Sequence, residues 1–268
     1  MVKEFSKLPS RIIIKLDNAV RYDESIEFGR EAVDKLKKIL GEYHSDTLTA
    51  MSNLASTLYR KGQYNKAEEL YKEVIEKMKN HKELGENHSN TLTAMNNLAN
   101  ILDKKGQYDE AEELYKEVIE KMKNHKELGE NHPDTISALH NLANTLDDKG
   151  AYDEALKLKK QVVEKRKEIL GENHPDTISV LNNLANTLDK KGAYDEALKL
   201  QKQVLEKSKE ILGANHPDTL TSMGSLAFIL DKKGEYNEAW KLQKQVVEKR
   251  KEILVVRYHK ELVWIKVK

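Results

Sequence analysis

The sequence repeats itself with a period of 42 to 44 residues. A histidine opens each copy, and the five copies begin at His44, His88, His132, His174 and His216. A period in this range, kept over five copies, is typical of arrays in which each repeat is one small unit stacked on the next. This periodicity constrains the fold more than any other feature of the chain.

The third copy shows why each repeat should be a pair of helices. Apolar residues recur at steps of three and four from Ile136 to Leu146, which places them on one face of a helix over about residues 133–149. Pro133 suits the first position of that helix, and Gly150 suits its end.

A second helix is predicted to begin near Tyr152. It carries acidic residues in its first turn and basic residues at its far end, an order that matches the helix dipole. A helix pair this short cannot bury two apolar faces alone. Neighbouring pairs must therefore stack and share one continuous core.

The second copy contains a recognisable motif, Met95-x2-Leu98-Ala99-x2-Leu102, then Gly106, then Ala111-x3-Tyr115. It resembles the tetratricopeptide repeat (TPR) signature, with Met95 in place of Trp, Ala99 in place of Gly and Leu102 in place of Tyr. The repeat length and the opening Asn-His-Pro-Asp-Thr resemble the 42-residue repeats of kinesin light chains. They also resemble arrays at the C-terminal ends of some signalling NTPases.

This resemblance, which covers about residues 11–254, implies an all-α fold. The expected architecture is a right-handed TPR α-solenoid of antiparallel helix pairs, with five full repeats, a degenerate N-terminal repeat and a C-terminal helical extension. The expected boundaries are 1–43 for the N-terminal repeat or cap, 44–254 for the array and 255–268 for the extension.

Two local departures from the repeat carry expectations of their own. Val20 stands where the other repeats have a glycine, so we expect that turn to differ. The joints after the first two copies are two residues longer than the later ones. The extra residues should lengthen the second helix or its loop at little cost.

The chain after Leu254 lacks the usual turn and predicts a longer last helix. Leu254, Tyr258, Leu262 and Ile265 follow at steps of four, four and three, so we expect helix to at least Leu262. A strand is the competing interpretation, because apolar residues alternate with lysines near the end. We expect Tyr258, Leu262, Trp264 and Ile265 to mediate self-association, most simply as a two-fold homodimer.

Composition excludes several classes of function. The formal net charge of +1 gives no general attraction to nucleic acid or to an anionic membrane. The absence of cysteine excludes disulfides, thiol chemistry and zinc–thiolate sites. No apolar run reaches the length of a membrane span, so we expect a cytoplasmic protein. No phosphate loop, nucleophile motif or paired carboxylates are recognisable, so we expect neither an enzyme nor a cofactor.

The polar residues around the signature leucine are the candidates for ligand contact, because first helices line the concave groove of TPR arrays. They lie two residues before, one before and two after that leucine. The predicted peptide-binding groove residues are Asn53, Asn96, Asn97, Asn100, His140, Asn141, Asn144, Asn182, Asn183 and Asn186. A carboxamide both donates and accepts hydrogen bonds, so such a ladder could hold a peptide backbone.

The competing interpretation is that some of these asparagines bond only the adjacent helix or water. This applies above all to the position just before the leucine, which we expect to be the most structural of the three.

Charge near the ladder favours neutral or basic partners. The aspartates beyond it are solvated helix ends or a groove edge, at Asp103, Asp147, Asp148, Asp189 and Asp231. Chaperone-binding repeats and kinesin light chains use basic groove residues to hold acidic ligands, and those basic residues are missing here. We therefore expect a protein or peptide partner that is neutral or basic.

The histidines do not form a metal site by their spacing, since no two of the repeat-opening ones lie close on one helix. We expect them to cap or pack the helices. The predicted function is a scaffold that binds a protein segment in the concave groove. Two alternatives stay open: a sensor or regulatory module of a signalling NTPase, and an engineered or consensus-like array without a specific ligand.

Overall fold

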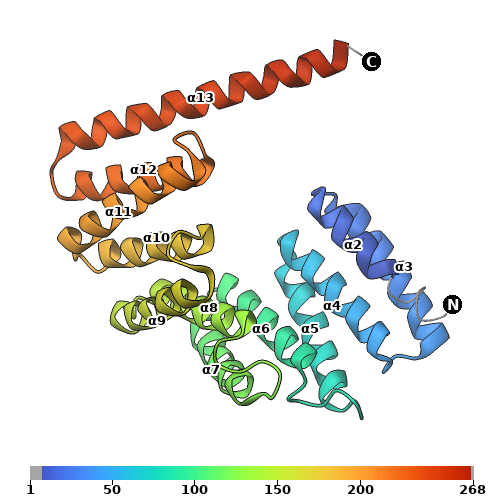
Figure 1. Cartoon of the computed structure of the whole chain (residues 1–268). Coiled ribbons are helices and arrows are strands. Elements are labelled where there is room, and N and C mark those ends of the chain that lie inside the picture. The colour runs from blue at the N-terminus through green and yellow to red at the C-terminus, as the bar shows by residue number, and fades with distance from the viewer. Residues whose placement is uncertain (1–7, 267–268) are drawn as a thin grey trace. The chain divides into compact units, whose positions relative to one another are not determined.

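The computed structural model describes residues 8–266, with side chains for residues 11–253. Within this range the regular structure is entirely helical (Figure 1). The helices are α2 (Leu8–Asn18), α3 (Tyr22–Leu40), α4 (Ser45–Arg60), α5 (Tyr64–Lys79), α6 (Ser89–Lys104), α7 (Tyr108–Asn124), α8 (Pro133–Lys149), α9 (Tyr152–Leu170), α10 (Pro175–Lys190), α11 (Tyr194–Leu212), α12 (Pro217–Lys232) and α13 (Tyr236–Lys266).

The chain forms two compact units, one ending at Lys149 and the other beginning at Gly150. In each unit every helix packs against the next one along the chain. First helices of successive pairs also contact each other directly, as α4 does α6 and α10 does α12. These first helices therefore lie on the inner side of each stack. The predicted all-α solenoid of stacked helix pairs is confirmed.

The residues that open each repeat build the joint between repeats. The Nδ1 atom of each opening histidine accepts a hydrogen bond of 3.1–3.2 Å from the backbone N–H two residues later. At four joints the next threonine donates from Oγ1 to the carbonyl oxygen of the preceding glycine, over 2.7–2.9 Å. These threonines are fully buried. The expectation that the histidines cap helices is confirmed.

The two longer joints place their extra residues in the loop. Helices α5 and α7 have 16 and 17 residues, whereas α9 and α11 have 19 each. In each longer loop a further histidine accepts from a backbone N–H two residues on, His81 from Glu83 and His125 from Glu127. The longer joint thus shortens the helix and replaces its last turn by a capped loop.

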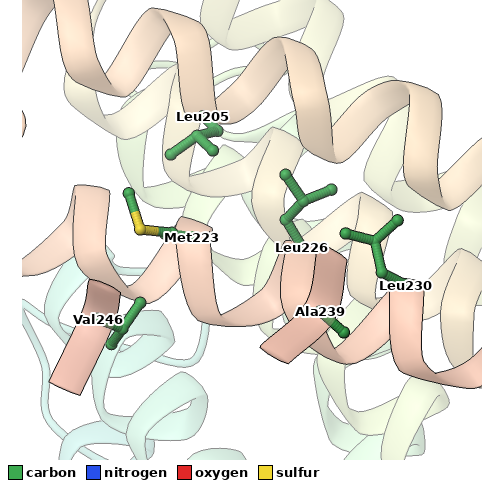
Figure 2. Close-up of a cluster of buried hydrophobic side chains, with 6 residues drawn as sticks. All are labelled: Leu205, Met223, Leu226, Leu230, Ala239 and Val246. Atoms are coloured by element: carbon green, nitrogen blue, oxygen red, sulfur yellow. The ribbon is translucent and has the colours of Figure 1, made fainter. Parts of the chain in front are cut away.

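The last repeat has a compact apolar core of its own (Figure 2). Its buried side chains come from α11, α12 and α13, and Leu198 and Leu242 pack against it. The cluster consists of Leu205, Met223, Leu226, Leu230, Ala239 and Val246. Helix α13 is therefore anchored as an ordinary second helix through its first three turns.

The predicted helical extension is confirmed, because α13 continues without a break from Tyr236 to Lys266. It reaches beyond the end of α12 (Figure 1). The competing strand is wrong. Tyr258, Leu262, Trp264 and Ile265 fall on this part of α13, outside the residues whose side chains the structure describes. Their role in self-association stays a prediction.

The turn at Val20 has the same backbone conformation as the glycine turns. Val20 has φ +59° and Gly62 has φ +80°. The N–H of Val20 bonds the carbonyl of Asp17, and the N–H of Arg21 bonds that of Leu16, as in the turn at Gly62. The expectation that this turn differs is wrong. The chain instead holds a β-branched residue in a left-handed conformation that it disfavours.

We expect Val20→Gly to raise the free energy of unfolding by about 1 kcal/mol. The left-handed conformation costs an L-residue roughly 1–2 kcal/mol, and the greater chain entropy of glycine offsets part of that gain. Val20 is exposed, so little packing is lost. Urea unfolding measures the effect, with Gly62→Val as the reciprocal control that should lose stability. A Val20→Gly variant no more stable than the wild type would contradict the strain.

Candidate functional site

The ten predicted groove residues all lie on first helices and are all half-buried. In the first unit, α4 carries Asn53, α6 carries three of them and α8 carries three. In the second unit, α10 carries the remaining three. The inner side of each stack is therefore lined by amides and one imidazole that are neither in the core nor fully in solvent.

In the first unit, buried tyrosines from the second helices reach this inner face. The Tyr71 hydroxyl, on α5, lies 2.5 Å from the Ser56 hydroxyl and accepts a hydrogen bond of 3.1 Å from Asn97 Nδ2. The Tyr115 hydroxyl, on α7, donates to Asn100 Oδ1 over 2.5 Å. Burial raises the pKa of both phenols, so both stay neutral.

In the second unit the same position carries other polar groups. Lys159 is buried on α9, and its Nζ donates to Thr187 Oγ1 over 2.7 Å. Gln201 is buried on α11, and its Nε2 donates to Asn182 Oδ1 over 2.8 Å and to the Ser222 carbonyl over 3.0 Å.

Tyr71, Tyr115, Lys159 and Gln201 share one position, seven residues after the tyrosine that opens each second helix. We call it the inner second-helix position. In three of the four repeats it supplies the partner of one ladder asparagine, and in the fourth Lys159 bonds Thr187 instead. Its role is not apparent in the sequence, because a single polar residue on an apolar helix face looks like an ordinary interruption. Its variation between otherwise similar repeats was the available signal.

Five ladder asparagines have no side-chain hydrogen bond among the described residues, namely Asn53, Asn96, Asn141, Asn183 and Asn186. In Asn96 the Oδ1 atom is also buried. Three of these five stand just before the leucine, where we expected the most structural role. At the position two after the leucine, Asn100 bonds Tyr115 and Asn144 bonds His140 over 3.2 Å. Most of the amides just before the leucine are thus unbonded, although we expected that position to be the most structural.

At the edge of the inner face, aspartates of one repeat accept hydrogen bonds from threonines of the next. Thr57 Oγ1 donates to both oxygens of Asp17, at 2.9 and 3.1 Å. Thr145 Oγ1 donates to Asp103 Oδ1 over 2.8 Å. Asp17 and Asp147 are buried, and the Asp103 side chain is only 10% exposed. The interpretation of these aspartates as solvated helix ends is wrong here, and it fits only Asp148 and Asp231, which are exposed.

Asp189 breaks this pattern because the next repeat has Ile229 where Thr57 and Thr145 stand in their repeats. Its Oδ1 atom is buried without a hydrogen-bond partner. Burial raises the pKa of the Asp189 carboxyl, and the charge of Lys232 opposes this only in part. The surroundings of Asp189 therefore disfavour the charged form of its carboxyl group.

Hollows on the surface of the described residues include one in each unit. One, of about 700 Å³, lies in the first unit between a long joint and the end of α7, and none of the ladder residues lines it. The other, of about 230 Å³, lies in the second unit between α10, α11 and α12. Asn182 and Asn183 line it, which places it on the inner face.

The family of the chain follows from this sequence and fold. A tetratricopeptide repeat model matches residues 20–80, 134–210 and 176–252, and a second tetratricopeptide repeat model matches residues 91–134. The chain belongs to the tetratricopeptide repeat family. No curated protein matches this chain in sequence.

Several solved structures are similar to this TPR protein. A putative kinesin light chain from Podosopora anserina, with nearly identical TPR-like repeats, is 29% identical, with a TM-score of 0.68 over 78% of this chain and 98% of that one. BtubC (BKLC) from P. vanneervenii has a TM-score of 0.71 at 18% identity, over 87% and 92% of the two chains. A Rap protein in complex with Competence and Sporulation Factor has a TM-score of 0.61 at 13% identity. The match covers 93% of this chain and 76% of that one. At those lower identities the likeness concerns the fold alone.

The TPR fold and these neighbours support a protein–protein interaction scaffold, and proteins of this family are in general scaffolds and not enzymes. None of the described helices combines the length and apolar character that a membrane crossing requires.

We expect Asn100→Ala to lower the free energy of unfolding by about 1 kcal/mol, because the buried Tyr115 hydroxyl loses its acceptor. Asn186→Ala, at the equivalent position without a partner, should change it by less than about 0.5 kcal/mol. Urea unfolding measures both variants, and a double-mutant cycle adds Tyr115→Phe alone and Asn100→Ala combined with Tyr115→Phe. Equal losses for Asn100→Ala and Asn186→Ala would refute the assigned bond.

We expect Ile229→Thr to weaken the pH dependence of stability that Asp189 causes. The folded-state pKa of Asp189 is raised, so stability is highest below the unfolded pKa and falls as pH rises through the folded pKa. A threonine hydroxyl would donate to the carboxylate, as Thr145 does to Asp103, and lower that pKa.

The readout is the titration of the Asp189 carboxyl by NMR, together with urea unfolding between about pH 3 and pH 7. Lost apolar packing at residue 229 shifts stability at every pH, so it does not imitate the effect. Asp189→Asn should remove this part of the pH dependence entirely. An unchanged midpoint for Asp189 in Ile229→Thr would sink the idea.

Proposed function

We propose that the inner face of the first helices binds an extended protein segment through its unbonded asparagine amides. The observation that carries this proposal is the set of five half-buried amides without an intramolecular partner. Asparagine disfavours helix interiors, so five such residues on packed helices call for a reason beyond local stability. Ligand contact supplies one.

The chemistry of the amide fits a peptide backbone. Each side chain offers an N–H₂ donor and a carbonyl acceptor, which match the C=O and N–H groups of an extended chain. Such hydrogen bonds are made to the backbone of the ligand, so they tolerate variation in its side chains. A segment of varied sequence could therefore be held by the same face.

The bonded members of the ladder support this role indirectly. Asn97 and Asn100 are hydrogen-bonded to Tyr71 and Tyr115, which are themselves buried. These contacts hold the first helices in place relative to the second helices. The unbonded amides thus project from a rigid support, which lowers the entropy cost of binding.

Charge favours a neutral or basic segment. The edge of the inner face carries Asp103, Asp189 and the exposed Asp231, and the ladder itself contains no lysine or arginine. Kinesin-light-chain-like repeats with basic groove residues would select acidic ligands, and this chain lacks that feature. Self-association through the extension of α13 stays a separate prediction.

We expect a variant with Asn53→Ala, Asn141→Ala and Asn183→Ala to lose about tenfold or more in affinity for bound peptides. Each lost hydrogen bond is worth roughly 0.5–1.5 kcal/mol, and 1.4 kcal/mol is tenfold. Stability should not fall, because none of the three has a partner to lose and alanine favours helix. An array of random-sequence peptides in acidic, neutral and basic classes measures the affinity.

The matched control changes three exposed asparagines at the joints, Asn87→Ala, Asn131→Ala and Asn173→Ala. It removes the same chemistry away from the inner face and should leave binding intact. Enrichment of acidic peptides by the wild type, or equal losses in the variant and the control, would overturn the proposal.

A further inference from the structure

We propose that the hollow between α10, α11 and α12 is a pocket for one basic side chain, lysine or arginine, of the bound segment. This inference rests on the proposed function and adds the chemistry that one part of the inner face selects. The pocket measures about 230 Å³. Its walls come from three helices, through residues that include Ile178, Asn182, Ser208, Asp218, Thr221 and Ser222.

The pocket exists because Ser208 is shorter than its counterparts in the other repeats. The equivalent residues are Leu36, Met78, Met122 and Arg166. Met78 and Met122 are buried and fill this position in the first two full repeats. Ser208 is equally buried, with 1% of its surface exposed, but its side chain ends after one carbon and one oxygen. The last joint thus leaves open the volume that a long side chain occupies elsewhere.

The lining of the pocket contains one buried polar atom without a partner, and a second such atom belongs to a residue that is bonded to the lining. The Ser208 Oγ atom is buried without a hydrogen-bond partner. Gln201 Oε1 is also buried and unpartnered, while Gln201 Nε2 is engaged by the lining residues Asn182 and Ser222. Buried polar atoms almost always have partners, so the unpartnered Ser208 hydroxyl in the lining, which can accept a hydrogen bond, indicates a site for a polar ligand group.

Charge and size determine which donor fits. Asp218 is the one charged residue of the lining, and no cationic side chain lines the described pocket. An ammonium group can donate three hydrogen bonds and a guanidinium group five, and neither accepts any. Such a group would match the acidic and polar lining of the pocket. The volume is below the roughly 300–1,000 Å³ of sites for drug-sized ligands, so it suits a single side chain.

The test is an NMR titration of the ¹⁵N-labelled full chain with four probes. The basic probes are N-acetyl-arginine amide and N-acetyl-lysine amide, and the controls are N-acetyl-glutamate amide and N-acetyl-norleucine amide. We expect saturable shifts at Asn182, Ser208 and Thr221 with the basic probes and none with the controls. Separate arginine and lysine arms show which cation fits better.

Two variants make the test specific to the pocket. Ser208→Met restores the side chain found in the first two full repeats and should weaken binding of the basic probes at least about tenfold, the 1.4 kcal/mol step. Asp218→Asn keeps the shape of the pocket, removes its charge and should weaken binding by up to about fivefold, as for a partly exposed ion pair. If Ser208→Met fails to fold, Asp218→Asn alone decides. Equal shifts with arginine and norleucine probes, or unchanged binding in the folded variants, would overturn the pocket.

The peptide array separates this proposal from the groove proposal. If Ser208→Met keeps the wild-type preference for basic peptides, the pocket is wrong and the groove stands. If the triple asparagine variant binds as the wild type does while Ser208→Met loses basic peptides, the groove is wrong and the pocket stands.

Discussion

The inner face depends on the hydrogen bond between a buried threonine and a glycine carbonyl at four of the joints. This bond ties the first helix of a repeat to the joint before it, and the histidine three residues earlier accepts a hydrogen bond from one of the N-terminal N–H groups. The short side chain of threonine allows one geometry. Each of these bonds fixes the start of a first helix against the joint that precedes it.

The inner face carries polar side chains that lie partly buried beside the apolar core. Burying a polar side chain costs free energy unless it is hydrogen-bonded. Tyr71, Tyr115 and Lys159 meet this condition by bonding polar residues on first helices. Gln201 meets it with only one of its two polar atoms. The unbonded amides and the unfilled volume at Ser208 are the places where these hydrogen bonds between helices are not made. A ligand could supply the missing partners there.

The periodicity and the helix stops were enough to predict the fold, including the continuation of α13 past Leu254, because they depend on local sequence. The ladder positions could be placed on first helices by counting from one leucine. Which amides are bonded could not be predicted, since the answer depends on Tyr71, Tyr115 and Gln201 from other helices. The turn at Val20 was mispredicted because the packing of α2 on α3 and α4 imposes a conformation that the residue alone would avoid.

The aspartate–threonine contacts also carry information about the order of the repeats. Asp17 faces Thr57 and Asp103 faces Thr145, whereas the first full repeat has Tyr59 at the aspartate position and the second has Ile101 at the threonine position. These three pairs are each matched in polarity, whereas Asp189 beside Ile229 is not. Copies that are nearly interchangeable in sequence are not interchangeable in place. Recombination that shuffled them would set Tyr59 against a threonine or an aspartate against Ile101, and would add unmatched pairs like that of Asp189 and Ile229 although every repeat remained intact.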